Sequence, residues 1–235
     1  MHYEAKAAHL GGNLSCLDIL MTLYHDVLKP EDVFILSKGH SAGALYVTLW
    51  SKGLLSDDDL KTFHGEGTSL PGHAPLGGGS LGHGLSIAAG VALGKKLQGQ
   101  PGRVYCLCSD GEMQEGSVWE AARMAGDRGL VNLKLIVDAN GWGGLGRVRS
   151  DTSMEMLSAC RWVTWRYGVG FTGAGDVDVL AAIGGLQGDA PTALLSTALG
   201  YHAKGLGVSF LQDRLESHYA VLTHDQYEQA MKELV

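Results

Sequence analysis

The chain has 235 residues and a hydrophobic content of 45%, which is enough for one large α/β domain or two small ones with a full core. Its formal net charge is −7, and it has no basic block, so nucleic acid and anionic membrane surfaces are not expected as partners. No apolar run is long enough to span a membrane, the start lacks a signal-peptide core, and the four cysteines form no CxxC pair. These features predict a cytoplasmic protein.

The first elements are expected to be a helix, a strand and a second helix. Ser15 or Asn13 is a candidate cap for a helix that runs to about Leu28. The apolar run 32–37 predicts a strand, and a helix is expected over 42–50.

A short helix with an acidic first turn is predicted from Ser56 to His64. Residues 77–82 formally contain GxGxxG, but a dinucleotide-binding turn needs a strand directly before it, and residues 65–75 are rich in turn formers. We therefore reject a dinucleotide site. The Ala- and Gly-rich segment 85–97 predicts a helix suited to close packing in an interior or a subunit interface.

The middle of the chain predicts a strand–helix–strand unit. Buried strands are expected over 104–108 and 133–137, and residues 117–128 have helical apolar spacing. The two strands of such a unit are parallel, so Asp110 and Asn140, which follow them, should meet at one edge of the sheet. Ligands bind at that edge in open α/β sheets.

Asp110 and Asn140 carry hard oxygen ligands of the kind that Mg²⁺ or Ca²⁺ prefers. Gly111 and Gly116 allow a ligand to approach the backbone, and the helix that follows can turn free N–H groups towards phosphate. The alternative is an Asp that caps a helix and an Asn-Gly turn. These residues alone leave the two interpretations open at equal weight.

The C-terminal third is less regular. We expect an irregular helix over Glu155 to Tyr167, a strand over 169–171, a helix over 178–186, a strand over 192–197 and a terminal helix over 227–235. No repeat or linker is visible, so the sequence predicts a single domain over 1–235. The expected fold class is α/β, a doubly wound and mostly parallel sheet with helices on both faces.

The run Ser109-Asp110-Gly111-Glu112, followed later by Asp138-Ala139-Asn140, resembles the thiamine diphosphate motif of the transketolase family, with Ser109 in place of its first Gly. The resemblance implies that the side chains of Asp110 and Asn140 and the backbone carbonyl of Trp142 hold Mg²⁺ (or Ca²⁺) and the cofactor's diphosphate.

The segment Gly79 to Gly84 is similar to the family's Gly-x-Leu-Gly-Gln-Gly element, with His83 in place of Gln. The resemblance places Glu115 either in an acidic network across a dimer or, equally, in a merely stabilising position at a helix start. The full set of implied cofactor contacts is Gly79, Leu81, Asp110, Gly111, Glu112, Glu115, Asn140 and Trp142.

Four histidines lie in segments that resemble channel elements of the family: His9, His40, His73 and His218. The resemblance implies that they handle hydroxyl and proton transfers. Two departures stand out, because Ala8 replaces a Gly before His9 and the family's Trp is absent before His218.

The resemblance implies the N-terminal, thiamine diphosphate-binding subunit of a split transketolase. Such an enzyme moves a two-carbon ketol unit from a ketose, expected to be phosphorylated, to an aldehyde. A C-terminal partner subunit would complete it as a 2+2 heterotetramer. The alternatives are a subunit of another thiamine diphosphate enzyme, such as a 2-oxo acid dehydrogenase, and a non-catalytic binding subunit. The histidine segments favour transketolase over the first, and the retained Asp110 and Asn140 argue against the second.

Overall fold

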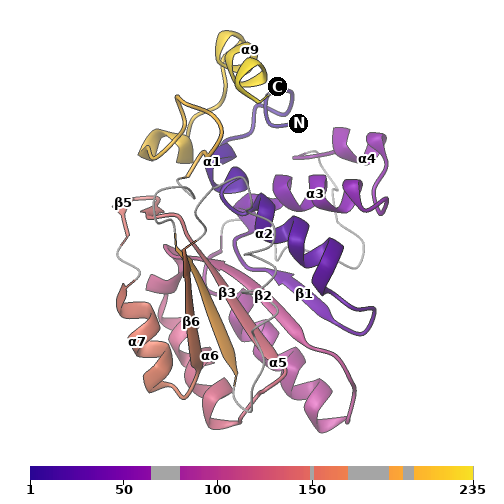
Figure 1. Cartoon of the computed structure of the whole chain (residues 1–235), viewed down its shortest axis with the longest axis vertical. Helices are drawn as coiled ribbons and strands as arrows, with labels where there is room; N and C mark the ends of the chain where they lie inside the picture. The colour runs from indigo at the N-terminus through magenta and orange to yellow at the C-terminus, as the bar shows by residue number, and fades with distance from the viewer. Residues whose placement is uncertain (65–79, 149–150, 169–190, 198–203, 235) are drawn as a thin grey trace.

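The computed structural model describes residues 1–64, 80–148, 151–168, 191–197 and 204–234 (Figure 1). The helices are α1 (Leu10–Leu14), α2 (Leu17–Thr22), α3 (Ala42–Ser51), α4 (Asp57–Lys61), α5 (Gly84–Leu97), α6 (Gly116–Asp127), α7 (Asp151–Ala159) and α9 (His224–Glu233). The strands are β1 (Val33–Leu36), β2 (Val104–Ser109), β3 (Leu133–Ala139), β4 (Trp142–Gly143), β5 (Gly146–Arg147), β6 (Val163–Gly168) and β7 (Thr192–Thr197). Short 3-10 or π turns are η1 (Leu23–Val27), η2 (Gly39–Ser41), η3 (Glu112–Gln114) and η4 (Leu215–His218).

Five strands form one sheet in the order β1-β2-β3-β7-β6, and every neighbouring pair is parallel. Every residue of β2 and β3 is buried, because helices cover both faces of the sheet. The predicted strands 32–37, 104–108, 133–137 and 192–197 are all present. The predicted doubly wound α/β fold is therefore confirmed.

Two apolar cores lie on the opposite faces of the sheet. Helices α5, α6 and α7 cover one face, and α2 and α3 cover the other (Figure 1). Cys106 and Cys108 are fully buried in the first core, as predicted for core thiols.

A third, smaller core joins the two ends of the chain. Val208, Leu211, Leu222 and Ala230 pack there, and the ring of Tyr3 stacks on Tyr227 with centroids 4.5 Å apart. The two termini accordingly lie close together beside α9 (Figure 1). This packing fastens the C-terminal segment onto α1.

The predicted irregular helix over Glu155 to Tyr167 is wrong in its second half. α7 ends at Ala159, Arg161 takes a left-handed backbone conformation (φ 66°), and β6 begins at Val163. Val163-Thr164-Trp165 is rich in strand formers, and β-propensity determines the structure there. The predicted strand over 169–171 and helix over 178–186 lie outside the described residues.

The predicted first helix is broken rather than continuous, and neither suggested cap residue caps it. α1 ends at Leu14 and α2 starts at Leu17. Asn13 instead donates to the carbonyls of His9 and His40, and Ser15 donates to Asp138. The polar residues are drawn into tertiary hydrogen bonds, which explains the break.

The remaining helix predictions are confirmed, with boundary shifts. α4 and α9 start with complete capping boxes from Ser56 and Thr223, so α9 begins three residues before the predicted Tyr227. Among the described residues, no helix is long and apolar enough to cross a membrane.

Candidate functional site

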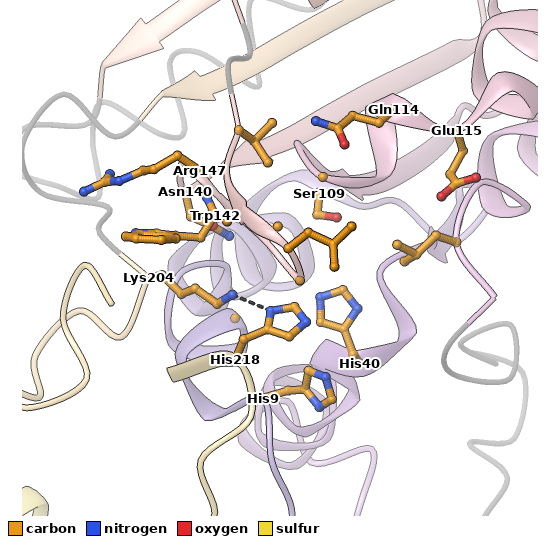
Figure 2. Close-up of a pocket in the computed structure, with 18 of the residues that line it drawn as sticks. His9, His40, Ser109, Gln114, Glu115, Asn140, Trp142, Arg147, Lys204 and His218 are labelled. Carbon is orange, nitrogen blue, oxygen red and sulfur yellow. Dashed lines mark hydrogen bonds between the residues drawn. The ribbon is translucent and has the colours of Figure 1, made fainter. Parts of the chain in front are cut away.

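A cavity of about 730 Å³ lies at the carboxyl-terminal edge of the sheet (Figure 2). Because the strands are parallel, the residues that follow β1, β2 and β3 all meet there. Its lining residues are His9, Gly12, Gly39, His40, His64, Leu81, Ser109, Gly111, Gln114, Glu115, Asn140, Trp142, Gly143, Gly144, Leu145, Gly146, Arg147, Val148, Lys204 and His218. A cavity of this size suits a cofactor-sized ligand.

The carboxylate of Asp110 is held in place by backbone donors. Its Oδ1 accepts from the N–H of Gly111 at 2.9 Å, and its Oδ2 accepts from the N–H of Gly141 at 2.7 Å. Burial, together with the nearby charge of Asp138, raises the pKa of Asp110 to about 7. A cation bound beside this carboxylate would offset both effects.

The amide of Asn140 has a defined orientation. Its Nδ2 donates to Oδ2 of Asp138 at 3.3 Å and to Ser15 Oγ at 3.4 Å. Its Oδ1 therefore points the other way and accepts from the N–H of Trp142 at 3.1 Å. An amide oxygen aimed in this way has a lone pair left for a hard cation.

Beneath these ligands lies a buried ion pair that sequence reasoning missed. Lys38, after β1, contacts Asp138 of β3, and both side chains are almost fully buried. Lys38 Nζ also donates to the carbonyl of Gly12 at 3.0 Å, and Ser15 donates to Asp138 at 2.7 Å. The signal available in the sequence was a lysine directly after a strand and before Gly39.

Three of the predicted channel histidines, His9, His40 and His218, come together on one wall of the cavity (Figure 2). The ring centroids of His9 and His218 are 4.8 Å apart, those of His9 and His40 are 5.4 Å apart, and those of His40 and His218 are 5.9 Å apart. Lys204 Nζ contacts His218 Nδ1. The family resemblance placed these histidines in one channel, and the structure places them around one cavity.

The electrostatics of this wall keep its rings neutral. Burial, then the charge of Lys38, lowers the pKa of His40 to about 2. Burial, then Lys204, lowers the pKa of His218 to about 4 and also lowers the pKa of His9. Burial, then Lys38, lowers the pKa of Lys204 to about 8. Neutral imidazoles can both donate and accept hydrogen bonds.

Two further predicted cofactor contacts, Leu81 and Glu115, line the cavity, whereas Glu112 does not. Its buried carboxylate instead accepts from the hydroxyl of Ser37 and, at 2.7 Å, from the N–H of Gly82. Glu112 therefore fastens the Gly82 turn to the end of β1.

Four other positions complete the comparison with the predictions. His83 is exposed at the start of α5 and lies outside the cavity lining. His64, which the sequence analysis placed only in a short helix, lines the cavity. The predicted His73 and Gly79 lie outside the described residues.

The residues present fit a metal-bound diphosphate. The donors are hard oxygens, and glycines form a cradle in which a Cβ at Gly111 would lie 3.2 Å from Gly143 Cα. No cluster of three His, Cys, Asp or Glu side chains suited to a metal occurs among the described residues.

We predict that Lys38→Met lowers the free energy of unfolding by about 3–5 kcal/mol, because it leaves the Asp138 carboxylate buried without its partner. The double variant Lys38→Met/Asp138→Asn should regain most of this loss. Urea denaturation of the purified chain measures both. Lys61→Met, at the exposed Lys61–Asp58 pair, is the matched control and should cost less than about 1 kcal/mol. Equal losses at Lys38 and Lys61 would contradict the buried-pair assignment.

A second prediction concerns pH. His40 should stay neutral down to pH 5, because its pKa lies far below the value of about 6.5 in an unfolded chain. The folded state then binds fewer protons than the unfolded state, so His40 lowers stability progressively as pH falls below about 6.5. Histidine ¹³C NMR with His40→Gln for assignment measures the titration, and the urea-unfolded chain is the reference. A midpoint near 6.5 for His40 in the folded chain would refute a desolvated ring.

Comparison with known proteins agrees with this geometry. Residues 2–234 match the family described as "Transketolase, thiamine diphosphate binding domain". The chain is 35% identical to one subunit of the apulose-4-phosphate transketolase of Phocaeicola vulgatus, over 99% of this chain and 88% of that protein. It is 34% identical to the 6-deoxy-6-sulfo-D-fructose transketolase subunit SqwG of a Clostridium species, over 96% of this chain and 88% of that protein.

Solved structures extend the match to the fold. The transketolase of Leishmania mexicana superposes with a TM-score of 0.77 at 22% identity, covering 97% of this chain and 41% of that one. The likeness therefore concerns about two fifths of that longer chain. Taken with the sequence relatives, it shows that this chain belongs to the transketolase family, in which it corresponds to the thiamine diphosphate binding domain.

Proposed function

We propose that the chain is the cofactor-binding subunit of a two-component transketolase, which transfers a two-carbon ketol unit from a ketose to an aldehyde acceptor. The observation that carries this proposal is one cavity with two opposed walls. Asn140 and Gly111 line one wall, and the Asp110 carboxylate lies buried directly behind it on the N–H of Gly141; we call this the metal wall. His9, His40 and His218 line the other. A silent binding module has no need of both.

In this proposal the oxygens of Asp110 and Asn140 and the backbone carbonyl of Trp142 hold Mg²⁺ (or Ca²⁺) together with the cofactor's diphosphate. Gly111 and Gly143 leave room for the phosphates to approach the backbone. When bound, thiamine diphosphate supplies the electron sink for cleavage of a carbon–carbon bond. Leu81 contributes an apolar surface at the Gly82 turn.

The histidine wall handles the sugar. His40 and His218 are kept neutral, so each ring can accept a hydrogen bond from a sugar hydroxyl through one nitrogen and donate one through the other. Lys204, buried against His218, adds an ammonium group at this wall that can pair with an anionic group of the sugar. These residues orient a polyol and move its protons.

The donor is proposed to be a ketose that carries an anionic group. The names of the two relatives given above each contain a sugar with an anionic group, a phosphorylated sugar in one and a sulfonated sugar in the other. All four cysteines are free thiols, which fits a reducing compartment such as the cytoplasm.

Completion of the site requires a C-terminal partner subunit, and we propose a 2+2 heterotetramer in which residues 1–235 form one domain. Two relatives are themselves described as subunits. Helix α5 offers a surface, since Ile87 is 41% exposed and a Cβ at Gly90 or Gly94 would meet no atom within 4 Å. Glu115, exposed at the cavity rim, is placed to join an acidic network with the partner.

We predict that Asp110→Ala greatly weakens metal-dependent binding of thiamine diphosphate, by about tenfold or more, because a site with few protein ligands loses its charged one. Calorimetry with Mg²⁺ on the enzyme assembled with its partner measures the affinity. Asp127→Ala, an exposed carboxylate at the far end of α6, is the control. An unchanged affinity in Asp110→Ala would refute the metal assignment.

We also predict that the purified chain alone shows no donor cleavage with thiamine diphosphate and Mg²⁺, and that adding the C-terminal subunit restores it. The reason is chemical, since the cofactor's aminopyrimidine needs a facing carboxylate and the described cavity wall offers only Glu115 at its rim. Full turnover by the single chain would overturn the two-component proposal.

A further inference from the structure

We propose that Asp213 is a positioning residue that fastens the hairpin β4–β5 to the Lys204–His218 wall. This inference rests on the proposed function, because the hairpin carries the carbonyl of Trp142. The two walls of the cavity come from different parts of the chain, and Asp213 contacts both of them.

The side chain of Asp213 holds both strands of the hairpin. Its Oδ1 accepts from the indole Nε1 of Trp142 at 2.8 Å, and its Oδ2 accepts from Arg147 at 2.7 Å. The guanidinium of Arg147 also lies over the Trp142 ring, 4.2 Å from its centroid. Three side chains therefore form a closed set of contacts, which we call the latch.

The backbone of Asp213 holds the other wall. Its N–H donates to the carbonyl of Lys204 at 2.9 Å, and the Lys204 side chain contacts His218. Asp213 adopts a left-handed backbone conformation (φ 54°), which non-glycine residues adopt uncommonly and Asp adopts more often than most. This turn aims the carboxylate at the hairpin while the N–H stays on Lys204.

Apart from the latch, the start of the hairpin is held by Asp110, which accepts from Gly141 N–H, and by Asn140, which accepts from Trp142 N–H. β4 and β5 have two residues each, and the flanking backbone bond runs from Val148 N to Gly141 O at 2.9 Å. Gly143 and Gly144 add conformational freedom at its turn. A second tie, from the Tyr219 hydroxyl to the Gly144 carbonyl, also comes from the C-terminal segment.

The latch is exposed, with the side chains of Arg147 and Asp213 61% and 48% accessible. Exposed ion pairs contribute little to global stability. Loss of the latch should therefore reduce the local order of the hairpin and disturb the geometry of the metal wall. The midpoint of global unfolding should not change.

The test uses Asp213→Asn, which keeps a residue tolerant of the left-handed conformation but loses one acceptor and the charge. Asp58→Asn, which removes an exposed carboxylate at the Lys61 ion pair, is the matched control. In the purified full chain without cofactor, Asp213→Asn should reduce hydrogen-exchange protection of the Val148 amide roughly fivefold, and Asp58→Asn should not. In the assembled enzyme the same variant should weaken Mg²⁺-dependent thiamine diphosphate binding by about fivefold, with Asp213→Glu restoring part of it.

Unchanged protection of Val148 in Asp213→Asn would overturn the latch. Reduced protection with unchanged cofactor affinity would overturn the positioning role. If Arg147→Met and the double variant Asp213→Asn/Arg147→Met lose the same amount of Val148 protection, the two side chains act through one shared contact. If the losses of the two single variants add in the double variant, the shared contact is overturned. If the wild-type assembly shows no metal-dependent cofactor binding, the proposed function and the positioning role both fail, while the exchange measurement still decides the latch.

Discussion

The buried ion pair between Lys38 and Asp138 is the interaction on which the site depends. It joins the ends of β1 and β3, two strands that are not neighbours in the sheet. Through Asp138 it fixes the amide of Asn140, and through Lys38 it holds the carbonyl of Gly12 in α1. The metal wall and the start of the histidine wall are thus built on one pair of charges.

A pair of charges in this position is poorly explained by stability alone. Burying two ions costs several kcal/mol each, and apolar residues of equal volume are often at least as stable. The pair instead supplies an oriented electrostatic field at the carboxyl-terminal edge of the sheet. Burial is the largest cause of both pKa shifts, and the pair adds to each: the charge of Asp138 further raises the pKa of Asp110, and the charge of Lys38 further lowers the pKa of His40. One side of the cavity thereby favours a bound cation, and the other side keeps its imidazoles neutral.

The elements of the fold that could be predicted from the sequence are those whose pattern lies within a short stretch of the chain. β2 and β3 are buried apolar runs, and the parallel geometry of a strand–helix–strand unit places Asp110 and Asn140 at one edge without any knowledge of contacts. The strand β6 was missed because its residues continue a helical apolar pattern across Arg161, whose left-handed turn has no sequence signature of the Gly type.

The ion pair itself could not be read from the sequence. Its partners lie 100 positions apart, and a lysine after a strand is ordinarily a solvent-exposed residue. The contacts of Glu112 were equally hidden in the sequence, since an acidic residue between glycines in a segment that resembles the thiamine diphosphate motif is predicted as a cofactor contact. Only the tertiary approach of Ser37 and Gly82 shows that its carboxylate is already occupied.

The two walls of the cavity differ in how they are supported. Asp110 and Asn140 follow the central strands β2 and β3, in which every residue is buried. His9 takes a left-handed conformation ahead of a five-residue helix, and His218 lies in a single turn held by the small C-terminal core. Elements with few buried contacts open at lower free energy than core strands, so the histidine wall is the more easily displaced of the two. In the proposed function, a rigid metal wall would hold the cofactor in one position while the histidine wall adjusts to the sugar. The metal motif therefore lies within one supersecondary unit, whereas His9 and His218 come from opposite ends of the chain and His40 from the turn after β1.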